Sequence, residues 1–268
     1  MRLKDRRILV TGAASGIGLA VARAFHAEGA FVGLLDRDAA GLAAALGMLG
    51  ARAAQAVADV FRRGRGAGGC RADRQQIGGL DGVVSCAGID LVRPFADTAA
   101  DEWMRVMNVN LNGPYHVCRA ALPFLRQAGS GTIVMVASGA ALRPLEQRTA
   151  YCCSKAGLVM FSKALAMDLA DDHIRVNAIC PGIIDTPMFS GLVSKSSRPA
   201  SRVGADPGSL RHQADRAARG YRPCRDVPDQ RRVGLCDGVG ARRRWRADVS
   251  LRAKALPTYE EPGAAPSP

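Results

Sequence analysis

The chain has 268 residues, 48% of them hydrophobic, which suits one globular domain of ordinary size. Its formal net charge of +13 would suit an acidic partner such as nucleic acid or a membrane surface, but residues 61–78 and 194–268 supply twelve of these charges. The sequence contains no run of 18 apolar residues and no signal-peptide pattern, so we expect a cytoplasmic protein that does not cross a membrane.

Five short and nearly continuous apolar runs predict strands that are buried on both faces. These runs are RILVTG (7–12), AFVGLLD (30–36), DGVVSCAG (81–88), GTIVMVAS (131–138) and IRVNAICPG (174–182). Helical patterns lie between them, for example at residues 18–29 and 151–172. This alternation predicts a single α/β domain with a Rossmann-like, doubly wound parallel sheet and helices on both faces.

A glycine-rich turn, TGAASGIG, follows the first expected strand at residues 11–18. Its glycines let the backbone turn sharply and approach a pyrophosphate at the N-terminus of the next helix. Asp36 ends the second expected strand, where its carboxylate would bind ribose hydroxyls and repel a 2′-phosphate. The pattern predicts NAD rather than NADP, although Arg37 could soften this preference and Asp36 could instead cap the next helix.

Tyr151 and Lys155 stand four residues apart in a helical pattern, so their side chains share one face. An ammonium near a phenol favours the phenolate, so we expect Lys155 to lower the pKa of Tyr151 and make it a general acid/base. Ser138 follows the strand TIVMVAS at its carboxyl end, where open α/β sheets bind their ligands. The three residues together predict chemistry at an alcohol or carbonyl oxygen.

The ordered motifs of residues 6 to about 193 resemble those of the short-chain dehydrogenase/reductases, above all the 3-oxoacyl-carrier-protein-reductase-like members. The motifs are TGAASGIG, DV (59–60), CAG (86–88), NVN (108–110), Ser138, YCCSK (151–155) and PG (181–182). This resemblance implies a catalytic tetrad. In it, Tyr151 is the acid/base, Ser138 holds the substrate oxygen, Lys155 binds the nicotinamide ribose and Asn110 anchors a water in a proton relay.

The resemblance also implies the cofactor contacts, the reaction and the assembly. The contacts are Gly12, Ser15, Ile17, Gly18, Asp36, Asp59, Val60, Ala87, Gly88, Tyr151, Lys155, Pro181, Ile184 and Thr186. The reaction implied is hydride transfer between NAD and a secondary alcohol or ketone. Family members commonly form tetramers through the helices at about 101–127 and 150–171 and through the last strand, so we expect a homo-oligomer.

The cysteines include two departures from the family pattern. SCAG stands where the family has an asparagine, so Ser85 or Cys86 must replace an amide that ties neighbouring strands together. Cys152 and Cys153 follow the tyrosine, where small residues are usual. The eight cysteines form no CxxC pair and have no histidine at metal-binding spacing, so we expect neither disulfides nor a metal site.

The third departure is the segment 194–268, which matches no family motif. Nine of its 75 residues are Leu, Ile, Val or Phe, a composition that cannot bury a core. We therefore expect an NAD-binding and catalytic domain at 1–193 and a basic tail that is disordered or out of frame. In GC-rich DNA, a reading frame shifted by one base permits the sequence TGSVLVDGG at 237–245, which would supply the missing last strand of the family. The same shift permits a helix at the aberrant segment 61–78. A reading-frame error would explain both segments.

Two other functions stay open beside the NAD-dependent oxidoreductase. A chain without its substrate lid could bind NAD but turn nothing over. The arginines around Trp245 could contact phosphates and stack on bases, although the tail carries no signature of a nucleic-acid-binding module.

Overall fold

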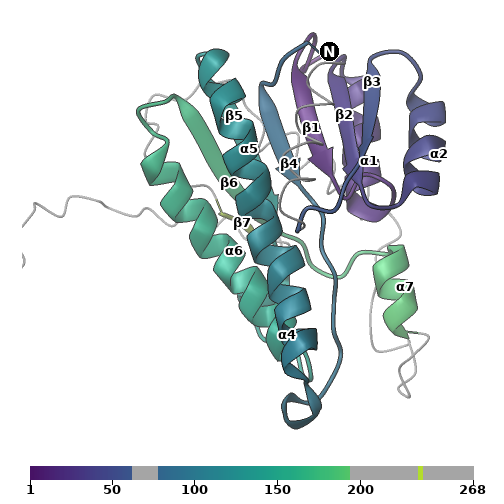
Figure 1. Cartoon of the computed structure of the whole chain (residues 1–268), viewed down its shortest axis with the longest axis vertical. Coiled ribbons are helices and arrows are strands. Elements are labelled where there is room, and N and C mark those ends of the chain that lie inside the picture. Colours follow the sequence, from purple (N-terminus) through teal and green to yellow (C-terminus); the bar gives the residue numbers. More distant parts are fainter. Residues whose placement is uncertain (62–77, 194–234, 238–268) are drawn as a thin grey trace, which may run out of the picture.

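A parallel sheet of seven strands forms the centre of the protein (Figure 1). The structure, a computed structural model, describes residues 1–61, 78–193 and 235–237. The strands are β1 (Arg7–Thr11), β2 (Phe31–Asp36), β3 (Ala53–Val57), β4 (Gly82–Ser85), β5 (Gly131–Val136), β6 (Ile174–Cys180) and β7 (Leu235–Asp237). Their order is β3-β2-β1-β4-β5-β6-β7, and all neighbours are parallel. The predicted doubly wound sheet is confirmed.

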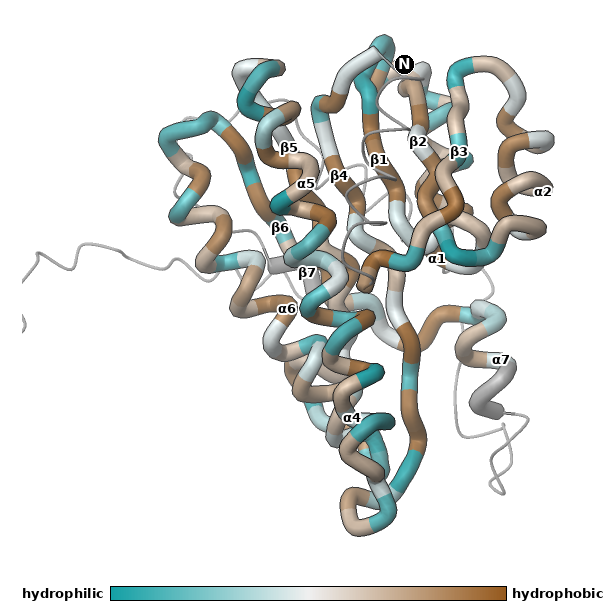
Figure 2. Tube along the Cα trace, viewed as in Figure 1, coloured by the Kyte–Doolittle hydropathy of each residue, from teal (hydrophilic) through white to brown (hydrophobic). Residues whose placement is uncertain are grey.

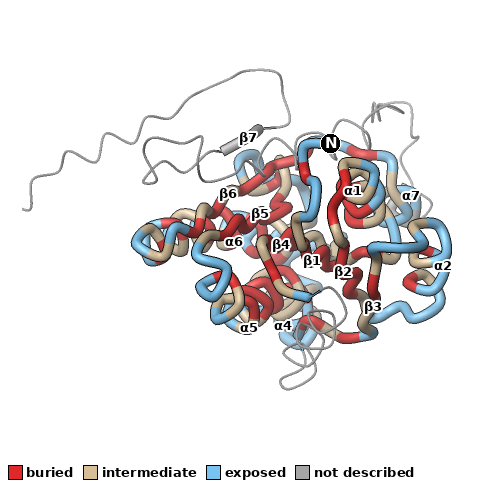
Figure 3. The backbone as a smooth tube through the Cα atoms, turned by 90° about the horizontal axis from the view of Figure 1, so that it is seen from above, coloured by how far each residue is buried: buried red, intermediate tan, exposed pale blue. Residues whose placement is uncertain are grey.

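Helices cover both faces of the sheet, as Figure 3 shows from above. The helices of the described residues are α1 (Gly16–Ala27), α2 (Ala39–Leu49), α4 (Ala100–Met107), α5 (Gly113–Gln127), α6 (Thr149–Asp168) and α7 (Pro187–Val193), of which α7 lies beyond the carboxyl edge of the sheet (Figure 1). A π-helical turn, η2 (Asn108–Asn112), joins α4 to α5, and short 3-10 turns lie at Phe95–Asp97 and Gly139–Ala141. Such π-helical turns are frequent at functional sites.

Side chains of each central strand alternate between two hydrophobic cores. In β1, Ile8 and Val10 belong to the core that contains Phe25 of α1. Leu9, which lies between them in sequence, belongs to the other core, together with Leu158 of α6. All five side chains are at most 1% exposed, so both faces of the sheet are covered and the strands need apolar residues at every position.

The five predicted strands are all present, but all except β2 end earlier than the apolar runs that indicated them. The residues left over, such as 86–88 and 181–182, form the loops that carry the motifs. The strand β3 was not predicted. Its sequence, AAQAV, has Val57 as its one β-branched residue, and it lies at the edge of the sheet with much of its surface half-exposed.

Our expectation that the chain lacks a last strand was wrong. Leu235–Asp237 forms β7, which pairs in parallel with β6 in the register Ala178↔Leu235 to Cys180↔Asp237. Three residues are too short to produce a strand signal within a basic segment, although they suffice to pair with the edge of β6. The helix that a shifted frame would permit at 61–78, the tail expected to be disordered or out of frame and the arginines around Trp245 otherwise concern residues outside the described ranges.

Candidate active site

The motif residues gather at the carboxyl edge of the sheet. The chain proceeds from β1 toward β2 on one side and from β4 toward β5 on the other, so the strand order reverses between β1 and β4. Such a reversal leaves a crevice outside the carboxyl ends of the strands, where doubly wound sheets bind their ligands. The loop after β6 crosses the same edge on its way to α7 (Figure 1).

The glycine-rich turn after β1 is packed directly against the loop after β4. Gly12 has a φ of 67°, and a Cβ there would lie 2.8 Å from the backbone nitrogen of Ala87. A Cβ on Gly18 would lie 2.0 Å from the carbonyl oxygen of Gly12. Glycine is therefore required at both positions, because a larger residue at position 12 would push the two loops apart and one at position 18 would clash with the backbone of the turn itself.

A buried hydroxyl ties these two loops together. Oγ1 of Thr11, which is fully buried, accepts hydrogen bonds from the backbone N–H groups of Cys86 and Ala87, both at 3.2 Å. We expected the side chain of Ser85 or Cys86 to replace the family's asparagine in this tie. The structure makes the tie with Thr11 and two backbone amides, which explains how a cysteine is accommodated at this position.

The N-terminus of α1 is open to an anion. Its N-cap residue, Ser15, is exposed and makes no capping hydrogen bond with its side chain, and the first turn contains no acidic residue. Ile17, in the same turn, is half-buried. By contrast, Asp38 caps α2 by accepting a hydrogen bond from the N–H of Gly41 at 3.1 Å. The backbone N–H groups of α1 and the helix dipole can therefore receive a phosphate.

Asp36 lies beside this opening at the end of β2. Its carboxylate accepts hydrogen bonds from the N–H of Ala14 and the N–H of Asp38, both at 3.1 Å. Because Asp38 itself caps α2, the alternative that Asp36 is the cap is wrong. An ionised carboxylate offers about four acceptor positions, so two remain for ligand hydroxyls. Arg37 is exposed.

Ser138, Tyr151 and Lys155 converge between β5 and α6. The Ser138 hydroxyl is hydrogen-bonded to the Tyr151 side chain and also accepts the N–H of Ala140 at 3.1 Å. Lys155 is 4% exposed, and its Nζ donates to the carbonyl oxygen of Val136 at 2.9 Å. Nζ lies 5.9 Å from the centre of the Tyr151 ring. The predicted proximity of the three side chains is therefore present.

Asn110 is fully buried in η2 and connects three parts of the site. Its Oδ1 accepts the N–H of Ile89 at 2.8 Å, and its Nδ2 donates to the carbonyl of Ile89 at 2.9 Å and to Oγ of Ser154 at 3.0 Å. The Ser154 hydroxyl donates in turn to the backbone carbonyl of Tyr151 at 2.8 Å. Asn110 thus fixes both the loop after β4 and the first turns of α6.

Gly88 lies between Asn110 and Lys155. A Cβ at this position would lie 3.4 Å from Oδ1 of Asn110 and 3.4 Å from Nζ of Lys155. The missing side chain at Gly88 therefore brings the loop after β4 close to both polar groups. This places Ala87 and Gly88, which the family resemblance assigns to the cofactor, at the head of Lys155.

The pKa of Tyr151 differs from our expectation. Burial raises the pKa of Tyr151 above its ordinary value, and the Ser138 hydrogen bond opposes this rise. We expected Lys155 to lower this pKa, but burial outweighs the lowering contributions, and the Lys155 ammonium donates its hydrogen bond to a carbonyl of β5. Burial also lowers the pKa of Lys155 to about 8. Tyr151 is therefore protonated at neutral pH.

Asp90 and Arg148 were not singled out from the sequence. Oδ2 of Asp90 lies 3.0 Å from a guanidinium nitrogen of Arg148, and the side chain of Asp90 is 4% exposed. Burial raises the pKa of Asp90, and the charge of Arg148 opposes this. A signal was available, since Asp90 interrupts the apolar segment Ile89–Val92, in the connection from β4 toward α4 that Figure 2 shows largely in brown.

The other residues that the family resemblance assigns to the cofactor lie around the same edge. Oδ1 of Asp59 accepts the N–H of Phe61 at 3.1 Å. Val60 is 6% exposed and packs beside Gly113, where a Cβ would lie 2.7 Å from Cγ2 of Val60. The side chain of Val60 is therefore part of the core, so the predicted contact with the cofactor would come from its backbone.

The loop after β6 closes over the glycine-rich turn. The carbonyl of Pro181 accepts the N–H of Gly139 at 2.7 Å, which joins this loop to the one after β5. Ile184 is buried, and Thr186 lies next to Gly16, where a Cβ would be 3.5 Å from the Thr186 methyl group. All three of these predicted cofactor contacts thus belong to one segment at the carboxyl edge.

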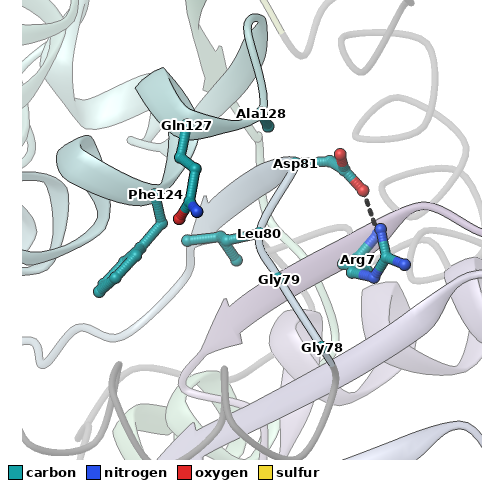
Figure 4. Close-up of a pocket in the computed structure, with 8 residues that line it drawn as sticks. All are labelled: Arg7, Gly78, Gly79, Leu80, Asp81, Phe124, Gln127 and Ala128. Carbon is teal, nitrogen blue, oxygen red and sulfur yellow. Dashed lines mark hydrogen bonds between the residues drawn. The ribbon is translucent and has the colours of Figure 1, made fainter.

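A hollow of about 240 Å³ lies at the opposite edge of the sheet, beside the amino ends of β1 and β4 (Figure 4). It is lined by Arg7, Gly78, Gly79, Leu80, Asp81, Phe124, Gln127 and Ala128. None of these residues belongs to a motif, so we assign the hollow no part in the site. The described residues contain no metal-binding cluster, no disulfide and no helix long and apolar enough to span a membrane.

Comparisons with known proteins agree with this geometry. The family described as short chain dehydrogenase matches residues 6–197. D-beta-hydroxybutyrate dehydrogenase of Cupriavidus necator is 36% identical over 194 residues, which cover 71% of this chain and 75% of that protein. The 3-oxoacyl-(acyl-carrier-protein) reductase FabG of Chlamydia muridarum is 34% identical over 194 residues, which cover 71% and 78%. D-threitol dehydrogenase of Mycolicibacterium smegmatis is 36% identical over 190 residues, which cover 70% and 73%.

Solved structures give the same result. Levodione reductase has a TM-score of 0.78 and 27% identity, and the match covers 88% of this chain and 98% of that one. An actinorhodin polyketide ketoreductase variant with NADPH has a TM-score of 0.80 and 28% identity, with coverage of 87% and 95%. The chain therefore belongs to the short-chain dehydrogenase family.

Proposed function

We propose that the protein is an NAD-dependent oxidoreductase that interconverts a secondary alcohol and its ketone. The observation that carries this proposal is the convergence of three side chains at the ligand-binding edge of the sheet: Ser138 lies beside the Tyr151 phenol, and the buried Nζ of Lys155 lies 5.9 Å from the centre of the Tyr151 ring. The names of relatives support the substrate class, because D-beta-hydroxybutyrate and D-threitol dehydrogenases act on alcohols.

Tyr151 is proposed to move the proton. Because burial keeps it protonated at neutral pH, the resting enzyme is ready to donate a proton to a carbonyl oxygen while Ser138 holds that oxygen. In the direction of oxidation, Tyr151 must first ionise and then accept the proton of the alcohol. A bound nicotinamide supplies the hydride donor or acceptor.

Lys155 and Asn110 are proposed to support this transfer. With a pKa of about 8, Lys155 is mostly cationic at neutral pH, and its position beside Gly88 suits a hydrogen bond to a ribose hydroxyl. Both amide hydrogens of Asn110 are already donated to Ile89 and Ser154. The amide nitrogen therefore has no hydrogen left to donate, and an oxygen atom of Asn110 would instead accept the hydrogen bond of a water of the proton relay.

The residues around α1 fit a dinucleotide. The uncapped N-terminus of α1 suits a pyrophosphate, and Asp36 retains acceptor positions for ribose hydroxyls. A 2′-phosphate would bring negative charge against that carboxylate, which favours NAD. The exposed Arg37 could attract the same phosphate, so the preference depends on the balance between these two neighbours.

We also propose that the enzyme is a homo-oligomer. Three methionines on α4 and α6, Met104, Met160 and Met167, are 49%, 62% and 69% exposed. Large apolar side chains on neighbouring helices suit contact with a second copy of the chain. Light scattering should therefore give a mass that is a multiple of the 28.2 kDa chain, and Met160→Lys should reduce it.

The decisive experiment replaces Tyr151 with Phe, which removes the hydroxyl and keeps the ring. Turnover of secondary alcohols with NAD should fall by about 10²-fold or more, while the affinity for NAD changes little. Tyr115→Phe is the matched control, because its hydroxyl accepts a hydrogen bond from Arg119 on α5, away from the site. Equal activity of the two variants would refute the role of Tyr151. NAD binding without turnover in the parent would instead identify a pseudoenzyme.

A further inference from the structure

We propose that the buried ion pair between Asp90 and Arg148 is a positioning element, which holds Tyr151 against Ser138 and keeps the charge around the phenol balanced. The proposal rests on the proposed role of Tyr151 as the acid/base. Neither Asp90 nor Arg148 needs to touch the substrate, because both act through the segment that carries Tyr151.

The ion pair joins two segments that come from distant parts of the sequence. Asp90 lies in the loop after β4, and Arg148 is the residue immediately before α6, three positions before Tyr151. A second contact runs parallel to the ion pair, since the N–H of Arg93 donates to the carbonyl of Gln147 at 2.7 Å. Together the two contacts fasten the start of α6 to the loop after β4.

The backbone before α6 needs such an attachment. Gln147 has a φ of 57°, a left-handed conformation that is unfavourable for a residue with a side chain and persists when its surroundings hold it. The segment between Ser138 and Tyr151 also exposes Leu142 and Leu145, each 46% exposed, so it has little packing of its own. Contacts from outside the segment must therefore fix its path.

Burial makes this pair different from the ion pairs on the surface. The side chains of Asp90 and Arg148 are 4% and 23% exposed, whereas those of Arg126 and Asp172 are 54% and 25% exposed. Surface pairs add little to stability, but removing one partner of a buried pair leaves an uncompensated charge. The Asp90 carboxylate is further fixed, because its Oδ1 accepts the N–H of Leu91 at 2.7 Å.

The two partners act on Tyr151 in opposite directions. Besides the Ser138 hydrogen bond, the charged or titratable groups that face the phenol are Asp90, Arg148, the Cys152 thiol and the Lys155 ammonium. The carboxylate of Asp90 raises the pKa of Tyr151, and the guanidinium of Arg148 lowers it. Neutralising one partner should therefore shift the ionisation of Tyr151 in a direction that identifies the partner.

The test compares Asp90→Asn, Arg148→Gln and the double variant in the full chain. Ultraviolet titration of phenolate, with the titration of the Tyr151→Phe form of each variant subtracted, isolates Tyr151 among the four tyrosines. D90N should lower the pKa of Tyr151 and R148Q should raise it. The double variant should lie between the two single variants. This readout needs neither substrate nor cofactor.

Activity gives the second readout. Each single variant should lose about 10- to 100-fold in kcat/KM, mainly through kcat, because a small displacement of the acid/base disrupts the geometry of the transition state. The midpoint of the pH profile for alcohol oxidation should move to lower pH in D90N and to higher pH in R148Q. The double variant should recover part of the loss, as expected for two coupled residues.

Arg126→Gln with Asp172→Asn is the matched control, because it removes an ion pair of 2.8 Å that links α5 to the turn after α6, far from Tyr151. Unchanged titration of Tyr151 in both single variants, or equal shifts in the control, would overturn the proposal. If one single variant is too unstable to titrate, the other single variant and the double variant remain as the test, and the double variant must fold and must titrate closer to the parent than that single variant does. If Tyr151→Phe retained activity, the proposed function would fail, but the titration would still report on the ion pair.

Discussion

Replacing Thr11 with Val should destabilise the protein strongly, although the two side chains have nearly the same shape. Oγ1 of Thr11 is the acceptor for the N–H groups of Cys86 and Ala87, and Thr11 is 0% exposed. Valine would leave two part-buried donors without this acceptor. A fully buried and unsatisfied donor costs about 1–3 kcal/mol, so two part-buried donors should lower the free energy of unfolding by about 2–4 kcal/mol. This is a large share of the roughly 5–15 kcal/mol of a typical domain.

Urea denaturation of the full chain, followed by circular dichroism, measures this loss. Thr11→Ser is the control, because serine keeps the hydroxyl and should lose much less than valine. The affinity for NAD should also fall in T11V, because the same tie holds the glycine-rich turn against the loop after β4. An unfolding free energy within about 0.5 kcal/mol of the parent's would refute the reasoning, since changes of that size are typical of neutral surface substitutions.

Three further predictions concern charge and reactivity. Burial lowers the pKa of Lys155 from 10.5 to about 8. Below pH 8 Lys155 is charged in both the folded and the unfolded protein, so burying the charge destabilises the fold fully. Between pH 8 and 10.5 only the folded protein loses this proton, so the stability of the fold rises with pH. Lys155→Met should therefore be more stable than the parent at pH 7, by at most about 3 kcal/mol, yet inactive, and denaturation at pH 7 and pH 10 should show the difference shrinking. Asp36→Asn should reduce a preference for NAD over NADP of roughly 1–3 kcal/mol, which fluorescence titration with both cofactors can measure; equal affinities in the parent would show that Arg37 compensates. Iodoacetamide at neutral pH should label the exposed Cys153 before Cys86, because burial raises the pKa of Cys86 to about 12, and mass spectrometry that found Cys86 labelled first would contradict this.

The fold was predictable because strands buried on both faces need apolar residues at every position. β1, β4 and β5 have such sequences, and the glycines after β1 are required by close contacts between backbones. β3 escaped prediction because it lies at the edge and half of it faces outward, so its sequence carries no continuous apolar run. β7 has three residues and pairs through its backbone, which leaves little trace in the sequence.

The candidate site was predictable as a set of residues but not as an electrostatic environment. The spacing of Tyr151 and Lys155 correctly indicated a shared face of α6. It could not indicate that Nζ of Lys155 turns to a carbonyl of β5, or that burial raises the pKa of the phenol. Asp90 and Arg148 are 58 positions apart in the sequence, and nothing local to either residue indicates that they meet.

The central claim is that this protein transfers a hydride and that Tyr151 moves the accompanying proton. The most direct measurement supplies NADH that carries deuterium at the hydride position, together with a panel of ketones, and analyses the alcohols by mass spectrometry. The account predicts one deuterium on the carbinol carbon of the product formed by the parent, and a loss of that product in Tyr151→Phe. Bound NADH that transfers no deuterium to any ketone, or equal transfer by both proteins, would contradict it.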